Sequence, residues 1–241
     1  MFPSRLETGK MKKLVMVCIV LSFCSGLMAA TLPISVGDTV NAKLNTTDWV
    51  MVNPKVGGIE VNLNGTTIGY DTPGLEDDAV WAGCYLLDVE NMVTAYKSFC
   101  MDVALDPATS YSSHTAYAVS SAMEQMWGTY YDGVVNDAPK AAAFQLALWE
   151  MVHETGAYDL GAGNFYLEAL NTNSPNNNGA TLTGLIGQAE TYLDSSLWTA
   201  QADLVLLDDG THQPFIAEIP EPATLVLLGL GSLTLLRRRR A

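Results

Sequence analysis

Two cysteines and one glutamine are the residues of this chain whose chemistry stands out. Cys84 and Cys100 fall on neighbouring segments rich in β-forming residues. In an exported protein, this placement on its own favours a Cys84–Cys100 disulfide. Gln145 is a single amide among the apolar residues of 141–150. We expect the domain to be organised around Cys100 and Gln145, with Cys84 competing for Cys100.

A helix over residues 138–155 must position Gln145. Pro139 stands near its first position, where proline is favoured, and Gly156 ends it. Gln145, Trp149 and His153 are spaced at i, i+4 and i+8, so the helix places their side chains on one face.

The hydrophobic periodicity predicts strands on both sides of a helical region. Residues 31–70 favour strands, with Asn64-Gly65 as a two-residue hairpin turn, and residues 71–78 an acidic loop. We expect a hairpin with arms at 80–87 and 96–103, a helix capped by Ser112 or Ser113, a short helix at 161–170, a helix at 183–197, and a closing hairpin of 202–207 with 214–219. The predicted fold is α+β, a β-sandwich or barrel-like sheet with an inserted helical subdomain.

The N-terminal segment has the features of an export signal. Met11-Lys12-Lys13 precedes an apolar run over 14–27 and the small residues Ala29-Ala30. This order predicts a secretory signal peptide over residues 1–30, with Met11 as an alternative start. A lipoprotein signal ending at Cys24 fits less well, because the bulky Phe23 precedes that cysteine.

The C-terminal segment, residues 219–241, has three parts. Pro220-Glu221-Pro222 comes first, an apolar run follows over 223–236, and four arginines occupy 237–240. Such a run spans about 21 Å as a helix, short of the roughly 30 Å hydrocarbon layer of a bilayer, so a lasting anchor is disfavoured. The order resembles the PEP-CTERM sorting signal of Gram-negative bacteria. The resemblance implies a transient membrane helix, an exosortase-type enzyme as partner, and delivery to the cell surface or extracellular matrix; an uncleaved tail anchor is the alternative.

Charge and motif content exclude several classes of function. Between Thr31 and Leu236 the chain has four Lys and no Arg against 25 Asp or Glu, a balance that repels nucleic acid. Glu76, Asp77 and Asp78 lack the alternating pattern of a calcium loop, and Cys and His do not cluster as zinc ligands do. A serine hydrolase motif is absent, and we expect neither a metal nor a cofactor.

Two short motifs of residues 31–218 together resemble the thioester domains of bacterial surface adhesins. Phe99-Cys100-Met101-Asp102 matches an aromatic-Cys-aliphatic strand motif, and Gln145-Leu146-Ala147-Leu148-Trp149 matches the Gln-x-Ala-aliphatic-Trp helix motif. The resemblance implies that the Cys100 sulfur attacks the Gln145 side-chain carbonyl, expels ammonia and leaves an internal thioester.

By that resemblance, an amine on a surface or matrix protein, or a polyamine, would displace Cys100 once per molecule. The protein would then be a covalent binder for adhesion or crosslinking and not an enzyme. Trp149 and His153 would support the reaction, with His153 and Glu150 the nearest groups for proton transfer. The alternatives are a non-reactive extracellular matrix protein with a Cys84–Cys100 disulfide and a secreted hydrolase with an unrecognised site.

Overall fold

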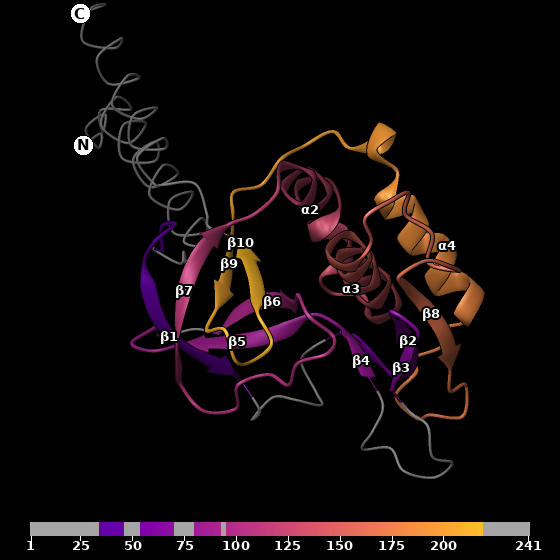
Figure 1. The fold of residues 1–241 in the computed structure, drawn as a ribbon, viewed down its shortest axis with the longest axis horizontal. Coiled ribbons are helices and arrows are strands. Elements are labelled where there is room, and N and C mark those ends of the chain that lie inside the picture. Colours follow the sequence, from indigo (N-terminus) through magenta and orange to yellow (C-terminus); the bar gives the residue numbers. More distant parts are fainter. Residues whose placement is uncertain (1–33, 46–53, 70–79, 93–94, 219–241) are drawn as a thin grey trace, which may run out of the picture. The chain divides into compact units, whose positions relative to one another are not determined.

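The computed structural model describes residues 34–45, 54–69, 80–92 and 95–218 (Figure 1). All of these residues belong to one compact unit of the chain. The expected signal peptide, the strand expected at 50–52, the acidic loop at 71–78 and the sorting tail at 219–241 lie outside the described residues.

A closed antiparallel barrel forms one part of the fold (Figure 1). Its strand order is β1-β5-β6-β10-β9-β7, and β7 pairs with β1 to close it. Buried aliphatic and aromatic side chains from these strands fill it. The strands are β1 Thr39–Leu44, β5 Tyr85–Val89, β6 Tyr96–Cys100, β7 Ser112–Ala118, β9 Leu204–Asp208 and β10 Phe215–Glu218.

A second antiparallel sheet is built around β2 Lys55–Leu63, which pairs with β3 Thr66–Gly69, β4 Val80–Gly83 and β8 Phe165–Leu170. The predicted turn at Asn64-Gly65 joins β2 to β3. Asn64 has a φ of 52° and Gly65 a φ of 82°, the left-handed conformations that a tight hairpin turn needs. This prediction is confirmed.

Helix α3, Ala138–His153, is the element that the barrel, the second sheet and the other helices share. It packs against α2 Ser121–Val134, α4 Leu182–Leu193, β2, β4 and β8 (Figure 1). Every residue from 141 to 150 is buried. A helix surrounded on all sides carries apolar residues all round and not only on one stripe, which explains its run of Ala, Phe and Leu.

Local sequence sets both ends of α3. The Asp137 side chain accepts a hydrogen bond from the Lys140 backbone N–H at 3.2 Å, and Pro139 stands in the first turn. Glu154 is extended and ends the helix just before Gly156. The helix predicted over 138–155 is therefore confirmed to within two residues.

Two helix predictions were wrong. Ser112 and Ser113 do not cap a helix but begin β7, which pairs with β1 and β9; α2 begins at Ser121, capped by Ser120. Residues 161–170 end in β8, which pairs with β2. In both places strand pairing across the fold decides the conformation, and local propensity does not.

The hairpin expected from 80–87 and 96–103 is confirmed only in part, because its first arm is divided at Cys84 into β4, which pairs with β2, and β5, which pairs with β6. The remaining predictions within the described residues hold with bounds shifted by a few residues. The closing hairpin is present as β9 and β10, and the helix expected at 183–197 is α4 followed by the 3₁₀ turn Ser195–Leu197. The α+β class is confirmed in its barrel form, with α2 and α3 following β7 in the chain and α4 following β8.

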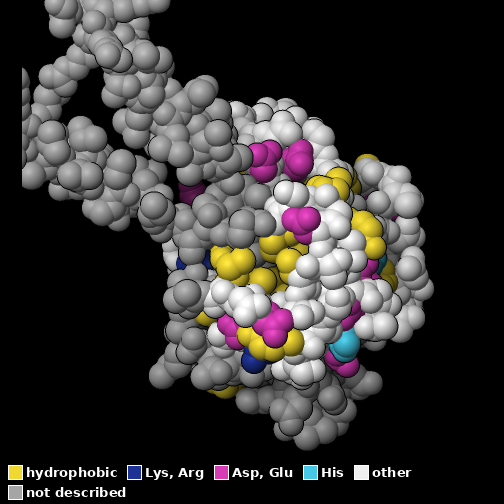
Figure 2. Space-filling model, turned by 90° about the vertical axis from the view of Figure 1, so that its left-hand side faces the viewer, with side chains coloured by type: hydrophobic (Ala, Val, Ile, Leu, Met, Phe, Trp, Pro, Cys, Tyr) yellow, Lys and Arg dark blue, Asp and Glu magenta, His cyan; other side chains and the backbone are white. Residues whose placement is uncertain are grey.

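The barrel face seen in Figure 2 is acidic. Asp and Glu side chains are scattered over it between apolar ones, and few Lys or Arg side chains are seen. This surface agrees with the charge balance of the sequence, which disfavours polyanionic partners.

We expect Asp137→Ala to lower the free energy of unfolding by about 1 kcal/mol, because the first turn of α3 loses its cap. Urea unfolding measures the change. Lys140→Ala is the matched control, since it removes only the exposed ion pair between Lys140 and Asp137 (3.1 Å) and should cost less than about 0.5 kcal/mol. Equal losses in the two variants would contradict a capping role.

Candidate functional site

The side chain of Gln145 is bound across the backbone of Cys100. Its Oε1 accepts a hydrogen bond from the Cys100 N–H at 2.9 Å, and its Nε2 donates to the Cys100 carbonyl at 2.5 Å. Gln145 is fully buried and Cys100 is 1% exposed. The structure thus brings together the two residues that the sequence singled out.

The pairing of β5 with β6 explains why a side chain is needed here. The register runs from Leu87 opposite Tyr96 to Tyr85 opposite Ser98 and then stops. Cys100 lies beyond this last pair, so β5 makes no hydrogen bonds to the Cys100 N–H and carbonyl. The Gln145 amide takes the position that a neighbouring strand would hold and satisfies both groups.

This arrangement also polarises the Gln145 amide. An N–H that donates to a carbonyl oxygen stabilises negative charge on that oxygen, and such charge develops when a nucleophile attacks the carbonyl carbon. The donor is fixed in a strand and the acceptor in a helix, so neither has to reorganise.

A cluster of aromatic rings packs on the residues next to Cys100 and Gln145. Phe99 makes edge-to-face contacts with Trp127 and Phe144, with ring centroids 5.5 and 5.1 Å apart. Tyr131 stacks on Trp127 at 4.5 Å. Side chains alternate along a strand, so the Phe99 ring and the Cys100 thiol point to opposite faces of β6, and the cluster fixes the strand from the other side.

Trp149 and His153 lie further along the same face of α3. Both rings contact Phe165, at 6.2 and 5.9 Å between centroids. Trp149 and His153 therefore share one face of α3, as predicted. Among the described residues, neither the Trp149 Nε1 nor the His153 Nε2 atom, both of which are buried, has a hydrogen-bond partner.

His153 connects this face to the residues after Cys100. Its Nε2 lies 3.8 Å from Oδ1 of Asp102. Burial lowers the pKa of His153, and the nearby Asp102 carboxylate opposes that shift. A neutral imidazole in this position is able to accept a proton.

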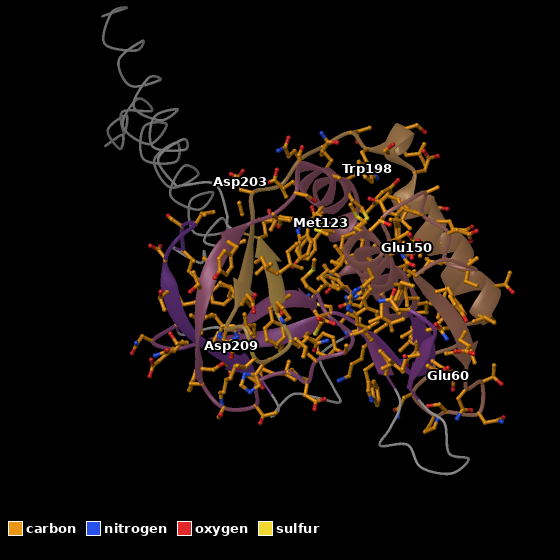
Figure 3. All side chains as sticks on the ribbon, viewed as in Figure 1. Glu60, Met123, Glu150, Trp198, Asp203 and Asp209 are labelled. Carbon is orange, nitrogen blue, oxygen red and sulfur yellow. The ribbon has the colours of Figure 1, made fainter. Side chains whose placement is uncertain are left out.

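Glu150 is a buried carboxyl group on α3, near β8 (Figure 3). Its Oε1 accepts a hydrogen bond from the Asp159 N–H at 2.7 Å, whereas its Oε2 has no partner among the described residues. Burial raises the pKa of Glu150 to about 7, and the Asp159 N–H partly offsets the rise. Because Glu150 follows Trp149 directly, it points off the face that carries Gln145.

The structure contradicts the disulfide alternative, because Cys84 and Cys100 are both free thiols. Cys84 leaves the barrel at this point: its N–H donates to the Pro54 carbonyl at 3.1 Å and not to β6. If the β5–β6 register continued, Cys84 would lie opposite Phe99, so its side chain and that of Cys100 would point to opposite faces. Burial raises the pKa of Cys84 to about 12 and that of Cys100 well above its usual range.

Lys55 is a site residue that the sequence did not reveal. It is 3% exposed, and its Nζ lies 4.8 Å from the centre of the Trp81 ring and 5.6 Å from that of Tyr85. Burial lowers the pKa of Lys55 to about 8, and the Cys100 thiol opposes the shift. It follows Asn53-Pro54 and precedes Gly57-Gly58, so it reads as part of a turn; its only signal is the rarity of lysine in this body.

Within the described residues, no group of three or more His, Cys, Asp or Glu side chains is placed to hold a metal ion. No helix in that same part of the chain is long and apolar enough to cross a membrane.

Comparison with known proteins assigns the C-terminal end of the chain. Residues 218–240 match the family model of the PEP-CTERM protein-sorting motif. The predicted sorting signal is thereby confirmed, and it marks an exported protein that an exosortase sorts to the surface of a Gram-negative cell. Searches of curated proteins and of solved structures gave no match.

We expect Gln145→Met to lower the free energy of unfolding by about 2–5 kcal/mol, because two buried backbone groups of Cys100 lose their partners. Chemical denaturation measures the loss. Leu146→Met, the next residue on the helix, also places a methionine in the core and should cost less than about 1.5 kcal/mol. Similar costs would show that the Gln145 hydrogen bonds stabilise nothing.

Glu150 makes stability depend on pH. Its pKa is about 7 in the folded protein and near the ordinary 4.5 when unfolded, so the folded state holds the proton more tightly. Stability should therefore fall as the pH rises from about 5 to 7, by on the order of 2 kcal/mol. Glu150→Gln should lose this component. Urea unfolding at pH 5 and pH 8 measures it, and parallel pH curves for the two proteins would contradict the assignment.

Proposed function

We propose that this exported protein is a covalent binder in which Cys100 and Gln145 form an internal thioester. The observation that carries the proposal is the buried Gln145 amide held across the Cys100 backbone by two hydrogen bonds. A purely structural role for Gln145 needs only those hydrogen bonds. Here, the residue that Gln145 binds is a cysteine, whose thiol is also a nucleophile.

The proposed reaction needs no external reagent. The Cys100 Sγ bonds to the Gln145 side-chain carbonyl carbon, the carbon–nitrogen bond breaks, and Nε2 leaves as ammonia with the proton from the thiol. An amide is a poor electrophile, so the two groups must be held close and in a fixed orientation. The fixed strand and helix support that requirement, as does the N–H that donates to Oε1.

The burial of Cys100 means that its thiol needs a base in order to react, and it also protects the thioester from hydrolysis. The pKa of Cys100 is well above its usual range, so its thiol is protonated and requires a proton acceptor. Gln145 and Cys100 are themselves buried from water, and a thioester lasts only where water is excluded.

The thioester would acylate an amine on a surface or matrix protein, or a polyamine. The amine nitrogen bonds to the Gln145 carbonyl carbon, Cys100 leaves as a thiol, and an isopeptide-type crosslink remains. His153, with Asp102 3.8 Å away, is the group on this face that can take the proton from the incoming amine, and the Trp149 N–H is an unused donor beside it. Each molecule reacts once, so the activity is adhesion or crosslinking without turnover.

A second candidate is a non-reactive matrix protein in which Gln145 serves only to close the open edge of β6. The missing continuation of β5 beyond the Tyr85–Ser98 pair favours it, since that gap alone accounts for a hydrogen-bonding side chain. Cys100 would then be a buried structural thiol.

Intact mass of the purified protein separates the two candidates. The thioester form should weigh about 17 Da less than the sequence mass because ammonia has left. Methylamine should then add to the protein and release one thiol. Cys100→Ala should abolish the mass deficit and Cys84→Ala should retain it. Full sequence mass in freshly purified wild-type protein, with no response to methylamine, would favour the non-reactive candidate.

A further inference from the structure

We propose that Lys55 takes the proton from the Cys100 thiol during thioester formation and hands it to the departing ammonia. This inference rests on the proposed function and assigns a proton-transfer partner to the same site.

The path of the chain brings Lys55 close to the strand that neighbours Cys100. Lys55 is the register partner of Gly83 in the β2–β4 pair, and the Cys84 N–H donates to the carbonyl of Pro54, the residue before Lys55, at 3.1 Å. Tyr85 then begins β5, which pairs with β6, the strand of Cys100. Lys55 therefore lies at the point where the chain passes from the second sheet into the barrel.

Tyr85 gives a second, independent link between the two groups. Its ring lies 5.6 Å from the Lys55 Nζ, and its register partner Ser98 is two residues before Cys100 on the same strand. Residues two apart on a strand share a face, so Tyr85, Cys100 and the Lys55 amine meet on one side of the sheet. The centre of the Trp81 ring also lies 4.8 Å from the Lys55 Nζ.

The charges at this position suit proton exchange. Among the described residues, the Cys100 thiol on β6 acts on the Lys55 amine, and the Tyr85 ring on β5 lies beside it. Burial raises the pKa values of Cys100 and Tyr85 well above their usual range. Burial shifts Lys55 the other way, to a pKa of about 8, so its amine is able to accept a proton above that pH.

The step balances without an outside reagent. The Lys55 amine accepts the thiol proton, and the Cys100 sulfur bonds to the Gln145 carbonyl carbon. As the carbon–nitrogen bond breaks, the Lys55 ammonium gives the proton to the departing nitrogen. Lys55 returns to its neutral form, and the products are the thioester and ammonia.

The test compares thioester formation in Lys55→Met, Lys55→Arg and wild-type protein. Each is made by cell-free synthesis between pH 7 and pH 10, and the fraction with the mass deficit of about 17 Da is followed over time. Wild-type formation should rise with pH and level off near pH 8. Both variants should form the thioester at least tenfold more slowly at pH 8, because methionine has no basic nitrogen and arginine does not deprotonate.

Three features of the experiment separate proton transfer from a structural role. Lys97→Met is the matched control, since the Lys97 Nζ donates to the exposed Asn136 at 2.7 Å, and it should behave as wild type. Arginine should fail although it keeps the charge. Lys55→Met should keep the cooperative urea unfolding of the wild-type protein, which a misfolded variant could not do.

Wild-type rates and an unchanged pH profile in both Lys55 variants would overturn the role of Lys55 and leave the thioester standing. A mass deficit with an alkylatable Cys100 and no response to methylamine would show that Lys55 is itself acylated, which also overturns it. A wild-type protein with no mass deficit at any pH would instead defeat the proposed function.

Discussion

The structure depends on one polar contact at the centre of an apolar core, the Gln145 amide on the Cys100 backbone. It joins the barrel to α3, and α3 in turn packs against the second sheet and the other helices. Two buried backbone groups without partners would cost several kcal/mol, a large part of the stability of a domain, so the intact Gln145 amide is held in one place. The same demand fixes a nucleophilic side chain next to a carbonyl group.

Burial determines what each group near this contact is able to do. Burial raises the pKa of Cys100, so the thiol stays protonated and unreactive unless a base removes its proton. Burial also lowers the pKa of Lys55 on β2 and of His153 on α3, so both groups give up a proton more readily and can act as bases. Export to the cell surface, marked by the sorting motif, would bring the proposed thioester to amines on surface or matrix proteins.

Sequence reasoning recovered the features that depend on local order. The α3 helix carries its own cap and proline, the Asn64-Gly65 turn specifies its own geometry, and the i, i+4 spacing fixes the shared face of Gln145 and Trp149. Features set by distant pairing were missed: β7 and β8 read as helical, because only their partners β1, β9 and β2 hold them extended. Lys55 was missed for the same reason, since its neighbours Trp81 and Tyr85 come from other strands.

The most direct measurement of the central claim is a crystal structure of freshly purified protein, with the electron density inspected between Cys100 Sγ and the Gln145 side-chain carbon. The proposed thioester predicts continuous density for a carbon–sulfur bond and no amide nitrogen on Gln145. A complete Gln145 amide, still donating from Nε2 to the Cys100 carbonyl and separated from the thiol by a van der Waals gap, would contradict it.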